Sequence, residues 1–437
     1  MRLKLLAIIS VLSLGFTAAH AQTETPLDTL TNRVGIISSD VSTLKRLKIT
    51  GYLQPQYQVA DSNGVASFAG GDFAQGMNKR FALRRSRVKF TYDYTGINWV
   101  LQFDASEKGV AVIDAYGKYT EPWMKAFYLQ CGIFNRPWGW EVPYSSSTRE
   151  TPERARWSQT LFPGERDLGA MVGFQMPSTS KWNFISAQVA MVNGTGRTAS
   201  DFDYQKDLIA HLGVNKSLMK EKIKFGVGLS YYSGGIREFT KYAYNMGTNS
   251  SGLKSWLVDS TSFASDSIAT RSYIGADLQF SYSSPIGVTT LRGEFIQGQQ
   301  PVPGNSNSTS PSTITANATT GLFPNTYNRN VMGYDLYFVQ NVNPIKSGVV
   351  VKYDFYDPNT DAEGMEIGAV DANNKANNLN KADIAYTTLG FGYILYLNAN
   401  VKFTLYRDMV TNETTNLKGW TTDHRDNIWT FRMQYKF

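Results

Sequence analysis

Hydrophobic and polar residues alternate with a period of two along most of the chain beyond residue 48. The segment from Phe81 to Tyr94 shows this pattern most clearly. One parity holds Val88, Phe90, Tyr92 and Tyr94, and the other holds Arg85, Arg87, Lys89, Thr91 and Asp93. Because the side chains of a strand alternate between its two faces, the segment predicts a strand with one apolar and one cationic face.

Similar amphipathic segments recur down the chain. They cover residues 48–59, 80–94, 97–106, 110–120, 126–136, 167–177, 182–193, 206–215, 222–232, 272–283, 287–298, 330–341, 347–357, 384–395, 398–408 and 427–437. The gaps near residues 95, 122, 179, 218, 285, 343 and 397 are short, and the intervening gaps are mostly long. This alternation predicts an all-β fold over residues 48–437, a transmembrane antiparallel β-barrel of about 16 strands around an aqueous channel.

The first residues have the pattern of an export signal. Arg2 and Lys4 precede an apolar run from Leu5 to Phe16, and a small-residue cleavage pattern ends at Ala21. This predicts a signal peptide over residues 1–21. The alternative is an N-terminal membrane anchor, for which the apolar run is short.

Residues 22–47 have a different periodicity, with apolar residues spaced alternately three and four apart. These residues are Leu27, Leu30, Val34, Ile37, Val41 and Leu44. Thr25 is a plausible N-cap, and Pro26 suits the first helical position. The spacing predicts a periplasmic α-helix that associates as a coiled coil. The alternative is an amphipathic helix that lies on its own barrel.

Composition narrows the classes of function. Loss of the signal leaves 41 basic and 36 acidic residues spread along the chain, which argues against a nucleic-acid partner. The single cysteine, Cys131, excludes an intramolecular disulfide, and its parity places it on the lipid side. The mature chain has two histidines and no Gly-x-Ser-x-Gly motif or dinucleotide-binding loop. We therefore expect no enzymatic activity, no cofactor and no metal.

The segment from Pro137 to Arg166, the third external loop of the predicted barrel, is rich in charged and aromatic residues. Such a loop can fold into the lumen and set the selectivity of the pore. The candidate anion-binding, pore-lining residues are Arg85, Arg87, Lys89, Arg136, Arg149, Arg154, Arg156 and Arg166. Arg84 has the lipid-side parity and is expected at the rim. The alternative is that the loop carboxylates pair with these bases, which leaves a weakly selective pore.

Several motifs together resemble the phosphate-selective porin O and P family of Gram-negative outer membranes. They begin at Ile49 (ITGYLQPQY), Phe81 (FALRRSRVKF), Cys131 (CGIFNRPWGWE), Glu165 (ERDLG) and Val192 (VNGTG), and the terminal strand ends on Phe437. The resemblance implies a trimeric, sixteen-stranded channel that passes anions such as phosphate. By matching position it implicates Arg84, Arg85, Arg87, Arg136 and Arg166. The heptad segment is not part of these motifs.

The sequence thus predicts an outer-membrane homotrimer, in contact with lipid, through which small anions such as phosphate or polyphosphate diffuse passively. One alternative is a general or oligosaccharide-permeable porin with weak ion selectivity. Another is a structural tether in which the N-terminal helix contacts the cell wall.

Overall fold

The computed structural model describes residues 26–437 except 198, 262–266, 307 and 312. The predicted signal peptide (1–21) and the predicted N-cap Thr25 lie outside the described residues. Contacts divide the chain into two compact units, Met1–Lys48 and Ile49–Phe437.

The first unit contains helix α2, Pro26–Leu44. Along α2, Leu30, Val34, Ile37, Val41 and Leu44 are 41–70% exposed, so the face with heptad spacing is accessible. The coiled coil and the domain boundaries at residues 21 and 47 stay predictions. No helix among the described residues has the length and apolar character needed to cross a membrane.

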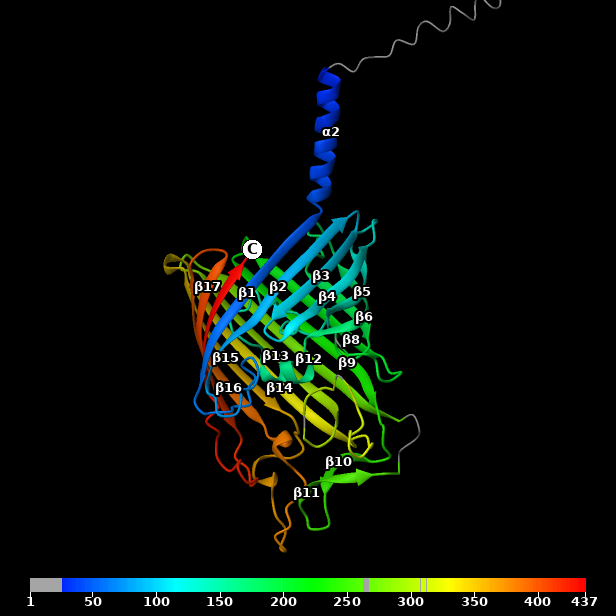
Figure 1. Ribbon diagram of the computed structural model, residues 1–437, viewed down its shortest axis with the longest axis vertical. Coiled ribbons are helices and arrows are strands. Elements are labelled where there is room, and N and C mark those ends of the chain that lie inside the picture. The colour runs from blue at the N-terminus through cyan, green and yellow to red at the C-terminus, as the bar shows by residue number, and fades with distance from the viewer. Residues whose placement is uncertain (1–25, 198, 262–266, 307, 312) are drawn as a thin grey trace, which may run out of the picture. The chain divides into compact units, whose positions relative to one another are not determined.

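The second unit is a closed antiparallel barrel of sixteen strands (Figure 1). Its first nine strands are β1 (Leu47–Ala60), β2 (Lys79–Tyr94), β3 (Ile97–Ser106), β4 (Gly109–Thr120), β5 (Phe127–Asn135), β6 (Arg166–Gln175), β7 (Ile185–Val192), β8 (Asp207–Leu218) and β9 (Ile223–Arg237). The other seven are β12 (Ile268–Ser283), β13 (Val288–Pro303), β14 (Thr326–Val342), β15 (Ser347–Asp357), β16 (Tyr386–Tyr396), β17 (Val401–Asn412) and β18 (Ile428–Lys436). The predicted fold class is confirmed.

Closure of the barrel joins its first and last strands. Strand β1 pairs with both β2 and β18, with Tyr57 opposite Phe431. Gly51 and Phe437 exchange two backbone hydrogen bonds of 3.0 Å at this seam. Closure pairs the edge strands that an open sheet would leave exposed.

The predicted alternation of faces is confirmed along the barrel wall. In β18, Trp429, Phe431 and Tyr435 are exposed on the outside, whereas Arg432 and Gln434 are buried toward the lumen. Cys131 is also exposed, in agreement with its outward parity. An outer apolar band and a polar interior are the features that let a barrel span lipid.

The connections also follow the predicted alternation, except that β3 and β4 are joined by a tight external turn. The segment after β9 carries a hairpin that the sequence did not predict, formed by β10 (Ala243–Thr248) and β11 (Lys254–Asp259). In Figure 1 this hairpin lies at the end of the barrel that carries the long loops. Strand β10 also pairs in parallel with the start of β14.

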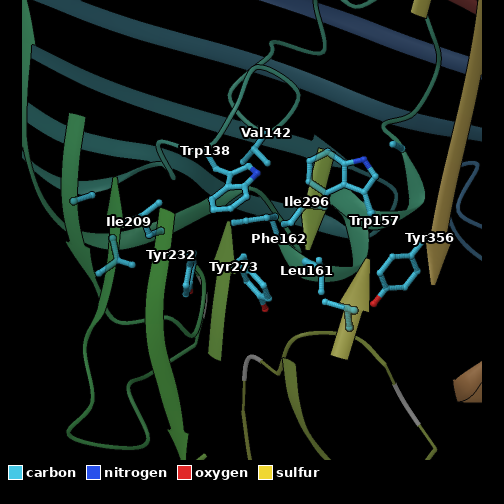
Figure 2. Packing of buried hydrophobic residues seen from close by; sticks show 14 of the residues in the cluster. Trp138, Val142, Trp157, Leu161, Phe162, Ile209, Tyr232, Tyr273, Ile296 and Tyr356 are labelled. Carbon is cyan, nitrogen blue, oxygen red and sulfur yellow. The ribbon is translucent and has the colours of Figure 1, made fainter. Parts of the chain in front are cut away.

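The largest apolar cluster lies inside the barrel, between the loop that follows β5 and the wall (Figure 2). Trp138, Trp157 and Phe162 of the loop are at most 1% exposed. Glycines in the wall make room for the indoles: a Cβ on Gly275 would lie 2.6 Å from Trp138, and one on Gly333 would lie 2.5 Å from Trp157. The lumen is therefore filled on this side, and the loop forms part of the pore wall.

Candidate functional site

The loop between β5 and β6, residues 136–165, is called the constriction loop here. Every residue from 151 to 158 is buried. The short helix α3, Arg156–Leu161, lies within this loop. Burial of a loop requires partners for its polar groups, and the barrel wall supplies different partners on opposite sides.

On one side the wall presents an acidic row, defined by Asp277, Glu294, Asp335 and Asp354. Each member stands directly opposite the next on neighbouring strands β12 to β15. Like charges in that position repel each other, so the row needs donors. The constriction loop provides several: Glu294 accepts from the backbone N–H groups of Trp140 and Glu141 at 3.1 and 2.9 Å.

Two further bonds join the loop to the acidic row. The Nε1–H of Trp157 donates to Asp335 at 2.8 Å, and the backbone N–H of Arg156 donates to Asp354 at 3.2 Å. Lys352 also pairs with Asp354 at 2.9 Å. The acidic row therefore anchors the constriction loop.

The Trp-Gly-Trp motif of the loop depends on its glycine. Gly139 has a φ of +48°, which favours glycine, and a Cβ there would lie 1.7 Å from Glu294. The absence of a side chain lets the backbone approach this carboxylate and donate from the two residues that follow.

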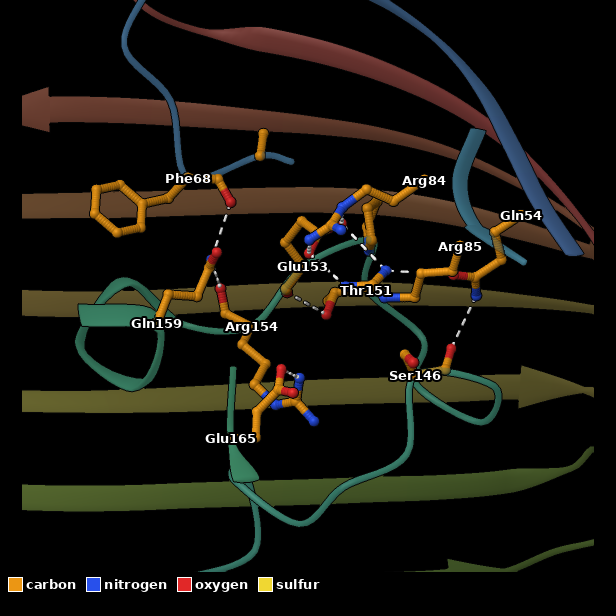
Figure 3. Close-up of polar contacts among 12 residues, drawn as sticks. Gln54, Phe68, Arg84, Arg85, Ser146, Thr151, Glu153, Arg154, Gln159 and Glu165 are labelled. Atoms are coloured by element: carbon orange, nitrogen blue, oxygen red, sulfur yellow. Dashed lines mark hydrogen bonds and ion pairs between the residues drawn. The ribbon is translucent and has the colours of Figure 1, made fainter. Parts of the chain in front are cut away.

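On the opposite side of the lumen, Glu153 of the loop meets Arg84, Arg85 and Arg432. Figure 3 shows the first two of these arginines beside Glu153. Arg84 donates from two nitrogens to the two carboxylate oxygens, both at 2.9 Å. Arg85 donates to the same oxygens at 3.3 and 2.8 Å. Arg432 of β18 donates to Oε1 at 2.8 Å and to the carbonyl of Pro152 at 2.6 Å.

Neighbouring arginines keep the Glu153 carboxylate ionised. Burial alone would raise the pKa of the Glu153 carboxyl, but Arg84, Arg85 and Arg432 hold this pKa well below its ordinary value. Glu165, at the end of the same loop, behaves similarly: burial opposes ionisation, yet Arg154 and Arg166 lower the pKa of Glu165. Both carboxylates are therefore charged at neutral pH.

Other contacts fix the lateral position of the loop. The side chains of Gln54 and Gln434 donate to the carbonyls of Ser146 and Ser147, both at 2.9 Å. Glu150 pairs with Arg292 at 2.9 Å. Bonds from several strands thus hold the loop in one position across the lumen.

A cavity of about 240 Å³ lies between the constriction loop and strands β2 to β4. Five arginines and three carboxylates line it: Arg84, Arg85, Arg87, Arg154, Arg197, Asp104, Glu153 and Glu165. This volume accommodates a small oxyanion with several waters. The lining carries a surplus of positive charge, although most of its arginines have an acidic partner.

Two more of the predicted residues belong to strand β2: Arg87 lines this cavity, and Lys89 does not. Arg87 pairs at 2.9 Å with Asp104, which stands directly opposite on β3. Lys89 lies one lumen position further along, opposite Gln102, and no described carboxylate lies within 4.0 Å of its ammonium group. Lys89 therefore contributes an unneutralised charge to the lumen.

The remaining predicted arginines have varied partners. Arg136 pairs with Asp167 at 2.8 Å, and Arg166 pairs with Asp114 at 3.0 Å, so both stabilise the ends of the loop. Arg154 lines the cavity, and its guanidinium also donates to three loop carbonyls, those of residues 141, 142 and 144.

Arg149 and Arg156 differ from the paired arginines. Arg149 is 3% exposed, and its three guanidinium nitrogens have no hydrogen-bond acceptor among the described residues. Arg156 stacks between Phe68 and Tyr386, 4.5 and 3.7 Å from the ring centroids. It faces a second cavity, of about 620 Å³, among the external loops.

The structure corrects one expectation and adds one residue. Arg84 is not a rim residue, because both it and Arg85 reach Glu153. The ladder between β2 and β3 begins only at Arg87, so Arg84 lies in the part of β2 that extends beyond the paired part of β3. Arg197 was not predicted, although it directly follows the Val192 motif.

No group of described residues has the arrangement of three or more His, Cys, Asp or Glu side chains needed to hold a metal ion. Residues 53–212 match the family model of phosphate-selective porin O and P. The resemblance inferred from the motifs is therefore confirmed over that part of the chain. No curated protein sequence matches the chain.

Solved structures with the same fold include proteins of two bacteria, of which OmpT is described as an outer membrane protein. OprB of Pseudomonas putida superposes with a TM-score of 0.55 at 9% identity, covering 92% of this chain and 97% of that one. OmpT of Vibrio cholerae, described as a trimer form, superposes with a TM-score of 0.50 at 9% identity, covering 90% and 99%. Together with the porin family match, the shared fold supports an outer-membrane porin.

Proposed function

We propose that this porin is a passive diffusion channel with a preference for small anions, phosphate among them. The observation that carries the proposal is the lining of the 240 Å³ cavity, where five arginines outnumber three carboxylates. Guanidinium groups present planar sets of donors that suit phosphate and carboxylate oxygens. No chemical step is needed: the solute enters, exchanges part of its hydration shell for these donors, and leaves.

The partial neutralisation of the arginines suits conduction. Passage requires binding strong enough to admit the anion and weak enough to release it. Arg87 and Asp104 share an ion pair at the cavity, whereas Lys89 on the same strand has no described acidic partner. An anion that passes the arginines would next meet this free ammonium group.

A conductance assay separates this proposal from a general or oligosaccharide porin. With chloride as the carrier in a planar bilayer, inorganic phosphate should reduce the current of the anion channel at millimolar concentration, whereas a neutral maltooligosaccharide should not. Block by the sugar and indifference to phosphate would favour the general porin. A purified protein that carries no current would favour the structural tether.

We also propose a homotrimer located in the outer membrane, with helix α2 in the periplasm. OmpT of Vibrio cholerae, which shares the fold, is described as a trimer form. The exposed apolar residues of α2 repeat at the three-and-four spacing of a coiled coil. Three helices attached to one trimer would associate at high effective concentration.

A further inference from the structure

Glu153 holds the guanidinium groups of the pore as a small oxyanion would. Its two carboxylate oxygens receive two bonds from Arg84, both at 2.9 Å, and two from Arg85, at 3.3 and 2.8 Å. Arg432 adds a further bond of 2.8 Å. Paired bonds from guanidinium forks to two oxygens are the arrangement with which arginine recognises carboxylates and phosphates.

We propose that Glu153 is a built-in competitor of the transported oxyanion and determines how weakly the pore holds its solute. The inference rests on the proposed anion preference. An entering anion displaces the carboxylate from part of its arginine set, and Glu153 returns when the anion leaves. The pore therefore binds the anion more weakly, while the arginine donors keep their arrangement.

The exposure of the four residues allows such an exchange. Arg84 keeps 29% of its side chain accessible, whereas the side chains of Glu153, Arg85 and Arg432 are at most 5% accessible. Arg84, Arg85 and Glu153 all line the 240 Å³ cavity. A solute in that cavity therefore meets Arg84 first and competes for it before reaching the more buried groups.

Hydrogen-bond donors near Glu153 are more numerous than the acceptors that could receive them. The Nε–H of Arg85 and all three guanidinium nitrogens of Arg149 lack an acceptor among the described residues. Arg149 is also close enough to contribute to the lowered pKa of Glu153. Removing the charge of Glu153 would leave several guanidinium groups with no internal anion, and an external oxyanion would then bind more tightly.

The geometry also selects the class of solute. A competitor for two forks needs at least two coplanar oxygens at the separation found in a carboxylate, as in phosphate, phosphonates and small carboxylates. Chloride offers a single point of contact and serves as the reference ion. Glu153 should therefore affect oxyanion binding more than chloride conductance.

The test is phosphate block of chloride current through single channels of the wild type and of Glu153→Gln. The glutamine keeps the size of the side chain and removes its charge. Loss of the competitor should lower the half-blocking phosphate concentration about tenfold, the effect of a charge-assisted bond of ordinary strength. Phosphate should also reside longer in each blocking event.

Glu221→Gln is the control, because Glu221 is 76% accessible, lies in the turn between β8 and β9, and neither lines the cavity nor contacts the constriction loop. Its half-blocking concentration should equal that of the wild type. If E153Q does not assemble, Glu153→Asp decides, because the shorter acid cannot span both forks and phosphate block should again become tighter.

Unchanged or weaker phosphate block in E153Q, or in E153D where only that variant assembles, overturns the inference. An anion-selective wild type would then leave the proposed function standing. A cation-selective wild type overturns both, so the two failures are distinguishable.

Discussion

Glu153 and Arg432 form an ion pair of 2.8 Å, although 279 residues separate them in the sequence. One belongs to the inward-folded loop and the other to the last strand, which closes the barrel against the first. The pair links assembly of the wall to the position of the loop. Removing one partner of a buried pair typically costs 3–5 kcal/mol, so this contact holds the constriction in place.

The combined change Arg85→Ala and Arg87→Ala should lower the ratio of anion to cation permeability. Arg85 supports Glu153 and Arg87 pairs with Asp104, so their loss leaves both carboxylates less neutralised. A factor of roughly thirty is expected, since the variant removes two charges and each contributes about 1 kcal/mol beside an aqueous path. Zero-current potentials in a salt gradient measure the ratio.

Arg407→Ala is the control for that double variant. Arg407 has the outward parity of β17, stacks on Trp429 at 5.0 Å and pairs with Asp61 at 3.2 Å. Its loss should leave the permeability ratio unchanged. Equal effects of the control and the double variant would contradict the assignment of Arg85 and Arg87 to the pore.

Anion conductance should rise as pH falls from 7 to 5. Burial raises the pKa of Asp426, at the external cavity, to about 6, although the nearby Arg156 opposes this shift and Asp423 reinforces it. A raised pKa means that Asp426 loses its negative charge as pH falls through that value, and the entrance becomes more positive. Glu153, whose pKa is lowered, keeps its charge over the same range.

The variant Asp426→Asn checks this pH dependence. It should show the high conductance at pH 7 and little further rise toward pH 5. A rise in the variant as large as in the wild type would assign the effect to other groups.

Glu294→Ala should loosen the constriction loop. Its carboxylate accepts the backbone N–H groups of Trp140 and Glu141, and each buried donor left without a partner costs about 1–3 kcal/mol. Single-channel currents should become larger and noisier. Ser281→Ala is the control, since Ser281 faces the lumen and its hydroxyl bonds to Thr290 at 3.1 Å. Quiet currents of wild-type size in the Glu294 variant would argue against anchoring by the acidic row.

Ile37→Asn should lower the thermal stability of the proposed trimer, and Ile36→Asn should not. The two residues are neighbours on α2 and are 60% and 61% exposed, but only Ile37 has the heptad spacing. Burial of one such side chain in a coiled coil contributes about 1.5–3 kcal/mol per helix. Native mass measurements in detergent at increasing temperature follow the dissociation of the oligomer. Dissociation of both variants at the same temperature would contradict the coiled coil.

Alternation of polar and apolar residues was sufficient to predict the barrel, since the two faces of each strand meet different solvents. It also placed Arg85 and Arg87 toward the lumen. It misplaced Arg84, which lies in the part of β2 beyond the β2–β3 ladder and reaches Glu153 of the constriction loop. The alternation in the sequence places Glu294 and Asp335 on the lumen face of their strands. That they stand directly opposite each other depends on the register of β13 and β14, which the sequence pattern does not specify.

The constriction loop was recognisable from its length, charge and aromatic residues, yet its pairings were not. Glu153 was one of several loop acids in the sequence, and only the fold brings it to Arg84, Arg85 and Arg432. The partners come from three distant segments of the chain, and their convergence requires closure of the barrel.

The most direct test of the central claim is the zero-current potential of the purified wild-type protein in a planar bilayer with a tenfold KCl gradient. An anion-preferring pore gives a potential of the sign set by chloride, and addition of phosphate to both sides reduces the conductance. A potential of the opposite sign, set by potassium, would contradict the account.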